Sequence, residues 1–143
     1  MRRALLQILH RCHTTHFSGK RGLGDTIVAD GGFDTGLSWL KGTGWGIASG
    51  VASIAGSAST NAITQTVGTN GKTYLITYTV TAVSAQGFRA YAGGTNGTIR
   101  TTAGTYSEQL LCGSTNTNIG IAASAAGTTG SIDNVSVQEV YGL

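Results

Sequence analysis

The sequence predicts an all-β fold in which two sheets pack face to face. Residues 72–83 show the clearest strand pattern, because tyrosine, isoleucine and valine alternate there with threonine and leucine. Segments of this kind recur along the chain with roughly 8–12 residues between them, as in sandwiches and barrels. After residue 24 no helical period competes with them, and 23 glycines, with no proline, supply the turns.

The expected strands follow from this alternation and from the turn residues that bound it. They are residues 26–30, 45–49, 51–55, 62–67, 72–83, 87–92, 98–102, 105–112, 118–123 and 131–140. The strongest turn signals are Thr69-Asn70-Gly71, residues 93–97 and residues 127–130. Such short, evenly spaced segments indicate a jelly-roll β-sandwich of about eight to nine antiparallel strands.

Charge divides the chain into a basic N-terminal arm, residues 1–24, and a β-sandwich domain, residues 25–143. The first 21 residues hold five Lys/Arg and no acid, whereas the rest hold four Lys/Arg and six Asp/Glu. The arm is therefore strongly cationic and the body weakly anionic. The body also lacks histidine, which makes acid–base chemistry hard to build there, so we expect no enzyme.

Residues 2–13 have the spacing of a short amphipathic helix. Its apolar stripe is formed by Leu5, Ile8, Leu9 and Cys12. The basic residues of the arm are Arg2, Arg3, Arg11, Lys20 and Arg21. Because a helix this short is marginal alone in water, we expect the arm to dock on another protein.

Composition disfavours several classes of partner. No run reaches the roughly 18 apolar residues that a membrane span needs. The four basic residues of the body are scattered and form no stripe for nucleic acid. The arm also resembles a mitochondrial presequence, being Arg-rich and free of acids, and this is kept as a minor alternative.

The cysteines and histidines leave their chemistry open. Cys12 and Cys112 are either joined in one disulfide or both reduced. His10, His13 and His16 cluster around Cys12, but their spacing matches no zinc site, so chance clustering in a basic arm is favoured.

Four motifs occur in order along the body. They are Asp30-Gly-Gly-Phe-Asp-Thr-Gly36 with Gly44-Trp45, Ile63-Thr-Gln-Thr-Val67 with Gly71-Lys-Thr-Tyr74, Gly104-Thr-Tyr-Ser-Glu108, and Gly130-Ser-Ile-Asp-Asn-Val-Ser-Val137. Over roughly residues 26–140 the chain thereby resembles the jelly-roll carbohydrate-binding modules found in phage capsid decoration and tail or fibre proteins. The resemblance implies that Phe33 and Trp45 lie in the core. It is specific for fold more than for function, because such sandwiches serve many purposes.

The resemblance also implies two kinds of site. Sugar-binding modules use exposed aromatic rings as stacking platforms, and Trp39, Tyr91 and Tyr106 are the candidates, with Phe88 a further aromatic; the alternative is that they are core residues. Trp39 is preferred because it lies in a glycine-flanked loop. Many members hold a structural calcium, which implies Asp133 as a ligand with Asp25 or Asp30; we favour the alternative that Asp133 and Asn134 satisfy strand-edge amides.

The late acids do not form a catalytic pair. Asp133 and Glu139 lie six positions apart, which along one strand is roughly 20 Å, too far for the two carboxylates of a glycosidase. Glu108 has no partner in the sequence pattern, and no serine elbow is present.

Two functions from different classes follow. The first is a structural accessory protein of a phage virion, a capsid decoration (cement) or fibre subunit that docks on other virion proteins through its arm. Copies are then expected to form a small closed oligomer, with a trimer favoured. The second is a carbohydrate- or receptor-binding module for a cell surface, which requires Trp39, Tyr91 and Tyr106 to be exposed on one face.

Overall fold

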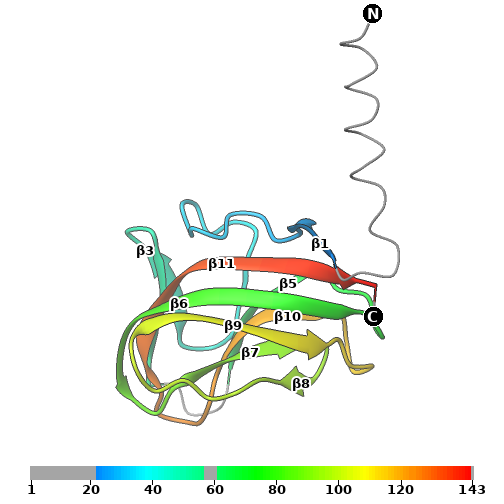
Figure 1. Cartoon of the computed structure of the whole chain (residues 1–143). Coiled ribbons are helices and arrows are strands. Elements are labelled where there is room, and N and C mark those ends of the chain that lie inside the picture. The colour runs from blue at the N-terminus through cyan, green and yellow to red at the C-terminus, as the bar shows by residue number, and fades with distance from the viewer. Residues whose placement is uncertain (1–21, 57–60, 143) are drawn as a thin grey trace, which may run out of the picture.

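The computed structural model describes residues 22–56 and 61–142, and these form two antiparallel sheets with no helix (Figure 1). The prediction of an all-β fold is confirmed for this part of the chain, and the arrangement is compatible with a β-sandwich. The strands are β1 (Gly22–Thr26), β2 (Leu40–Lys41), β3 (Trp45–Ala48), β4 (Val51–Ala55), β5 (Ala62–Thr66), β6 (Thr73–Ala85), β7 (Phe88–Ala92), β8 (Thr95–Asn96), β9 (Gly104–Leu111), β10 (Asn118–Ala123) and β11 (Thr129–Tyr141). The helix expected for residues 2–13 lies outside the described residues.

The first sheet, called sheet A, has the strand order β3-β4-β11-β6-β9. Its centre is formed by the two longest strands, β6 and β11, each of 13 residues. The first half of β11 pairs with β4, and its last residues pair with β1, from Gly22↔Tyr141 onward. The two ends of the described chain therefore meet in one strand pair.

The second sheet, called sheet B, has the order β2-β5-β10-β7-β8. Its central strand β10 pairs with β5 through Ile121↔Ile63 and with β7 through Ile121↔Ala90. These three side chains are fully buried, so they define the face that turns toward sheet A.

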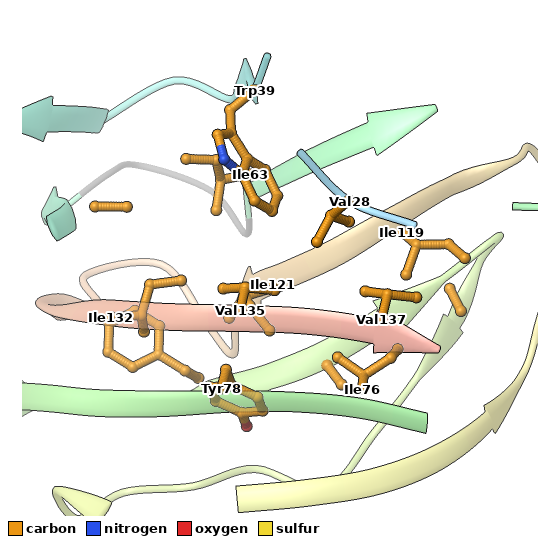
Figure 2. Packing of buried hydrophobic residues seen from close by; sticks show 14 of the residues in the cluster. Val28, Trp39, Ile63, Ile76, Tyr78, Ile119, Ile121, Ile132, Val135 and Val137 are labelled. Atoms are coloured by element: carbon orange, nitrogen blue, oxygen red, sulfur yellow. The ribbon is translucent and has the colours of Figure 1, made fainter. Parts of the chain in front are cut away.

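The core fills the space between the sheets (Figure 2). Ile76 and Tyr78 of β6 and Ile132 of β11 are buried on one side, opposite Ile63, Ile119 and Ile121 of sheet B. Phe33 and Trp45 are 0% and 7% exposed, as the family resemblance implied. Trp45 packs on Phe88 with ring centroids 5.8 Å apart.

Most strand predictions are confirmed, and two are wrong. The expected strand 26–30 is displaced, because β1 begins at Gly22, inside the segment that we assigned to the arm. Pairing with the far C-terminus decides this position, and no local pattern announces it. Residues 98–102 contribute only an isolated bridge between Arg100 and Phe88. The two-residue strands β2 and β8 were not predicted, since two residues carry no period.

One loop between β1 and β2 is organised by a single carboxylate. Asp30 has a φ of +54°, and its side chain accepts N–H bonds from Asp34 at 2.6 Å, Thr35 at 3.2 Å and Gly36 at 2.7 Å. These bonds, that of Gly36 foremost, lower the pKa of Asp30. The loop is thereby folded back on the sandwich, and its C-terminal residue Trp39 is carried into the core.

Candidate functional site

The outer face of sheet B, turned away from sheet A, contains a shallow groove. Ile119 and Ile121 of β10 point inward, so Gly120 and Ala122 between and beside them point outward. A Cβ atom at Gly120 would collide with the carbonyl oxygen of Ile63, which explains why only glycine fits at this point of the pair. The middle of the face therefore carries no side chain at Gly120 and only a methyl group at Ala122.

Side chains from the flanking strands form the walls of the groove. Register places Leu40 of β2 beside Thr64 of β5, Thr64 beside Gly120, and Gly120 beside Tyr91 of β7. The hollow measures about 290 Å³ and is lined by Leu40, Lys41, Gly42, Ala62, Thr64, Tyr91 and Asn118. This is close to the lower end of the usual range for small-molecule sites, roughly 300 Å³.

The aromatic wall is held in place by a hydrogen bond. Asn116 donates from Nδ2 to Tyr91 Oη at 3.0 Å, and its Oδ1 accepts the N–H of Asn118 at 2.8 Å. Tyr91 is half-buried. One edge of its ring is thus fixed, while the rest lines an open hollow.

Two hydrogen-bond donors of the groove, one from Asn118 and one from Thr64, have no partner among residues 22–56 and 61–142. Asn118 Oδ1 accepts a bond from Thr66 at 2.8 Å, which leaves the Nδ2 donor of Asn118 unused. Thr64 is only 6% exposed, and its hydroxyl makes no hydrogen bond within the described chain. Both donors lie where a bound molecule would sit, so the groove can exchange hydrogen bonds with a polar ligand.

Positive charge borders the groove. Lys41 belongs to its lining, and none of the six acids of the chain does. Arg89 lies one row away on the same face, beside the small Ala122, and its Nε is buried with no partner in the described residues. An unpaired buried donor is rare in folded proteins, and a ligand or water is the usual explanation.

The three predicted platform residues do not share a face. Trp39 is 4% exposed, stacks at 5.0 Å on Phe33 and donates from Nε1 to Asp30 O at 2.8 Å. Of the two alternatives for Trp39, an exposed platform or a core residue, the structure shows the core residue, because the Asp30-capped loop turns the ring inward. Phe88 is also fully buried.

Only Tyr91 of the three lines the groove. Tyr106 lies on the inward side of β9 in sheet A, where the Arg100 guanidinium stands 4.8 Å from its ring centroid and Thr102 bonds its hydroxyl at 2.8 Å. A platform made of all three aromatics is not assembled.

The carboxylates of Asp133, Glu139 and Glu108 are engaged in local structure. Asp133 Oδ1 accepts the N–H of Asn134 at 2.7 Å. Glu139 pairs with Lys72 at 3.0 Å, and both oxygens of Glu108 accept the N–H of Thr98, at 2.9 and 3.0 Å. No group of three His, Cys, Asp or Glu residues that could hold a metal occurs in the described part of the chain.

Cys112 directly follows β9 and is 1% exposed. Burial raises the pKa of its thiol, so it stays protonated at neutral pH. Cys12, the three histidines and the basic residues of the arm, from Arg2 to Arg21, lie outside the described residues. Within the described ranges, no helix is long and apolar enough to cross a membrane.

The outer face of sheet A differs from the groove. Its hydroxyls bond one another across the strands, Thr77 with Ser107 at 2.8 Å, Thr79 with Thr105 at 2.9 Å and Thr81 with Ser131 at 2.6 Å. We call these three pairs the hydroxyl ladder. Each hydroxyl in it already has a partner.

Sequence reasoning missed most of the groove. Thr64, Asn118 and Gly120 belong to segments that were expected as strands, but nothing in their local pattern marks them as neighbours. The one available signal was Gly120 inside an apolar strand, since glycine there often marks a close backbone approach. A scan of protein-family models and a search of curated proteins gave no match to this chain.

Proposed function

We propose that this protein is a non-enzymatic binding module that holds a carbohydrate in the groove of sheet B. The observation that carries the proposal is that the Tyr91 ring lines the same hollow as two unused donors, Thr64 Oγ1 and Asn118 Nδ2, with only Gly120 between Tyr91 and Thr64 in the strand register. The fold proposed for it is a jelly roll of the carbohydrate-binding-module type.

The groove matches the chemistry of a sugar ring. A pyranose has an apolar C–H face that packs on an aromatic ring and a rim of hydroxyls that needs donors and acceptors. Tyr91 and Leu40 offer the apolar walls, and Thr64 and Asn118 offer hydrogen bonds. Lys41 and Arg89 add positive charge, which favours sugars with a carboxylate or phosphate group.

The proposal is tested with a glycan array followed by calorimetry on the best binder. Tyr91→Ala and Asn118→Ala should each weaken binding by about tenfold or more, which corresponds to at least ~1.4 kcal/mol. Tyr141→Ala is the matched control, because Tyr141 is 51% exposed on sheet A and does not line the groove. A chain that binds no glycan, or that binds equally well after Tyr91→Ala, contradicts the proposal.

A second function, compatible with the first, is that of a phage virion accessory protein fastened by its basic arm. The opposite charges of arm and body support it. The arm joins the sandwich at Gly22, next to Leu23 and Tyr141, which are both 51% exposed. A virion protein bound through the arm would also cover these apolar side chains.

This second proposal is tested by sedimenting the tagged chain with purified phage particles. Replacing Arg2, Arg3, Arg11, Lys20 and Arg21 by glutamate should abolish co-sedimentation. The Tyr91→Ala variant of the chain, mixed with the same particles, is the control. Binding that survives the arm substitutions contradicts docking through the arm.

A further inference from the structure

The edge strands of the two sheets are unequal. β2 and β8 have two residues each and β3 has four, while β1 has five and is broken by a register shift between Leu23 and Thr26. The edge strand β9 has eight residues in unbroken register with β6 (Figure 1). Folded proteins usually keep their free edges short or irregular, because an open edge pairs with other chains. Only β9 departs from this rule among the described strands.

The open side of β9 can be assigned residue by residue. Cys112 donates its N–H to Lys72 O at 2.8 Å, on the side of β6. Backbone groups alternate in direction along an antiparallel strand, so even-numbered residues of β9 bond to β6. The N–H and C=O groups of Thr105, Ser107 and Gln109 therefore point away from the sheet, and no other described strand pairs with them.

The side chains of β9 also leave this edge unprotected. The strand contains no lysine, arginine or proline, the residues that commonly block edge pairing. The outward side chains are exposed and carry no charge: Thr105, Ser107 and Gln109 are polar, and Leu111 is apolar. Glu108, the one charged residue, is turned inward, with its carboxylate bonded to Thr98.

We propose that β9 pairs antiparallel with β9 of a second copy, joining two A sheets across a two-fold axis. Side chains that oppose each other across the strand pair must lie on the same face of the joined sheet. Odd-numbered residues of β9 must therefore oppose odd-numbered residues of the second copy, and even-numbered residues must oppose even-numbered ones. Of the two central registers, one opposes Glu108 to Glu108 of the second copy, which like charge disfavours. The other places Ser107 on the axis and is the one we infer.

Charge complementarity favours a second copy in this register. Glu108, whose carboxylate keeps its bonds to Thr98, then lies opposite Tyr106 of the second copy, and the guanidinium of that copy's Arg100 stands 4.8 Å from the centroid of this ring. By symmetry the same contact forms twice. The pairing has two-fold symmetry in place of the trimer that the virion setting suggested.

The full-length chain is tested by sedimentation equilibrium over a concentration series. The wild type should dimerise, and Ser107→Lys should raise the dissociation constant by about tenfold or more, because two lysines then oppose each other on the axis. Ser136→Lys is the matched control. Ser136 lies in the same cross-strand row, paired with Thr77 as Ser107 is, but on the central strand β11.

A cross-link gives a second readout that does not depend on affinity. Directly opposed residues of a hydrogen-bonded pair have Cα atoms about 5.5 Å apart, within reach of a disulfide or a short thiol cross-linker. In a Cys12→Ala background, Ser107→Cys should yield a covalent dimer and Ser136→Cys should not.

Three results would overturn the proposal. The first is a wild-type chain that stays monomeric at every concentration. The second is a dimer that Ser107→Lys and Ser136→Lys affect equally, which would place the interface elsewhere, for example on the basic arm. The third is cross-linking at position 136 as efficient as at position 107.

Discussion

The outer faces of the two sheets are built from similar small residues, yet they are prepared for different contacts. On sheet A the hydroxyls of the ladder bond one another at 2.6 to 2.9 Å, so this part of the face has no unused hydroxyl. On sheet B the donors of Thr64 and Asn118 stay unused in the lining of the groove. Because a satisfied hydroxyl gains little from a ligand, the proposed binding site is on sheet B and not on the hydroxyl ladder.

The difference originates in the central strands. β6 of sheet A presents threonines outward, each long enough to reach the neighbouring strand. β10 of sheet B presents Gly120 and Ala122, which reach nothing. The same sandwich core can therefore support a row of paired hydroxyls on one face and unused donors on the other, depending on two or three outward positions.

The largest change in stability is expected at one of two consecutive residues, Trp39 and Leu40, of which the first is buried and the second lines the groove. Trp39 is buried and Leu40 is 54% exposed in the wall of the groove. Trp39→Ala should lower the free energy of unfolding by about 3–5 kcal/mol, because a large cavity is left. Leu40→Ala should change it by less than about 0.5 kcal/mol and weaken only ligand binding. Urea denaturation measures both, and equal losses would contradict the assignment of the two sides.

The next effect concerns the core beneath the hydroxyl ladder and depends on pH. Burial raises the pKa of Tyr78 to about 12, while the Arg100 charge opposes this in part. The folded state holds this proton more tightly than the unfolded state, whose tyrosine pKa is about 10. The protonated Tyr78 hydroxyl thus contributes about 2–3 kcal/mol to the free energy of unfolding. This contribution is complete below about pH 10 and is lost as the pH rises toward 12.

Two tyrosine variants check this prediction by denaturation at pH 7 and 11. Tyr78→Phe should remove the alkaline loss and be neutral or stabilising at pH 7, because Tyr78 Oη has no partner among the described residues. Tyr74→Phe should cost about 1 kcal/mol at pH 7, because Tyr74 Oη accepts the Thr69 N–H at 2.9 Å. The reverse order of stabilities would show that the Tyr78 hydroxyl is bonded.

A smaller loss is expected from filling the floor of the groove. Gly120→Ala should destabilise by about 1–3 kcal/mol, because the added methyl group meets the Ile63 carbonyl. It should also reduce glycan binding. Without the collision, Gly120→Ala should be neutral or stabilising, because alanine loses less backbone entropy in a strand than glycine does. Thermal unfolding measures the difference, and an unchanged or higher melting temperature would contradict the steric argument.

The smallest effect compares single hydroxyls on the two faces. A double-mutant cycle of Thr79→Val and Thr105→Val should give a coupling of about 0.2–1 kcal/mol. Thr64→Val should be neutral or slightly stabilising, because its hydroxyl has no partner in the described chain. A measurable cost at Thr64 would mean that this donor is satisfied within the protein and is not available to a ligand.

Local pattern was a good guide where an element depends on its own residues. The boundaries of β4 and β10 agree with the predicted segments 51–55 and 118–123. Alternation also identified the inward residues of β6, because a side-chain period of two holds whatever the strand pairs with. The burial of Phe33 and Trp45 came from motif resemblance, since isolated aromatics carry no period.

Trp39 shows why site prediction was harder. Its neighbours Ser38 and Leu40 are exposed, so the local sequence is that of a surface loop. The ring is buried because the Asp30 carboxylate binds three N–H groups of the same loop and turns it toward Phe33. That decision depends on a bond pattern nine residues away and not on hydropathy.

The sequence by itself determined the fold class, the strands that alternate strongly and the segregation of charge between arm and body, because each is a property of neighbouring residues. Only the tertiary structure decided that Thr64, Gly120 and Tyr91 share one row, that Tyr106 lies on a different sheet, and that β9 is left with an open edge. These features arise from pairing between strands far apart in the chain. Register and strand order are set by the collective packing of the core, and no single segment encodes them.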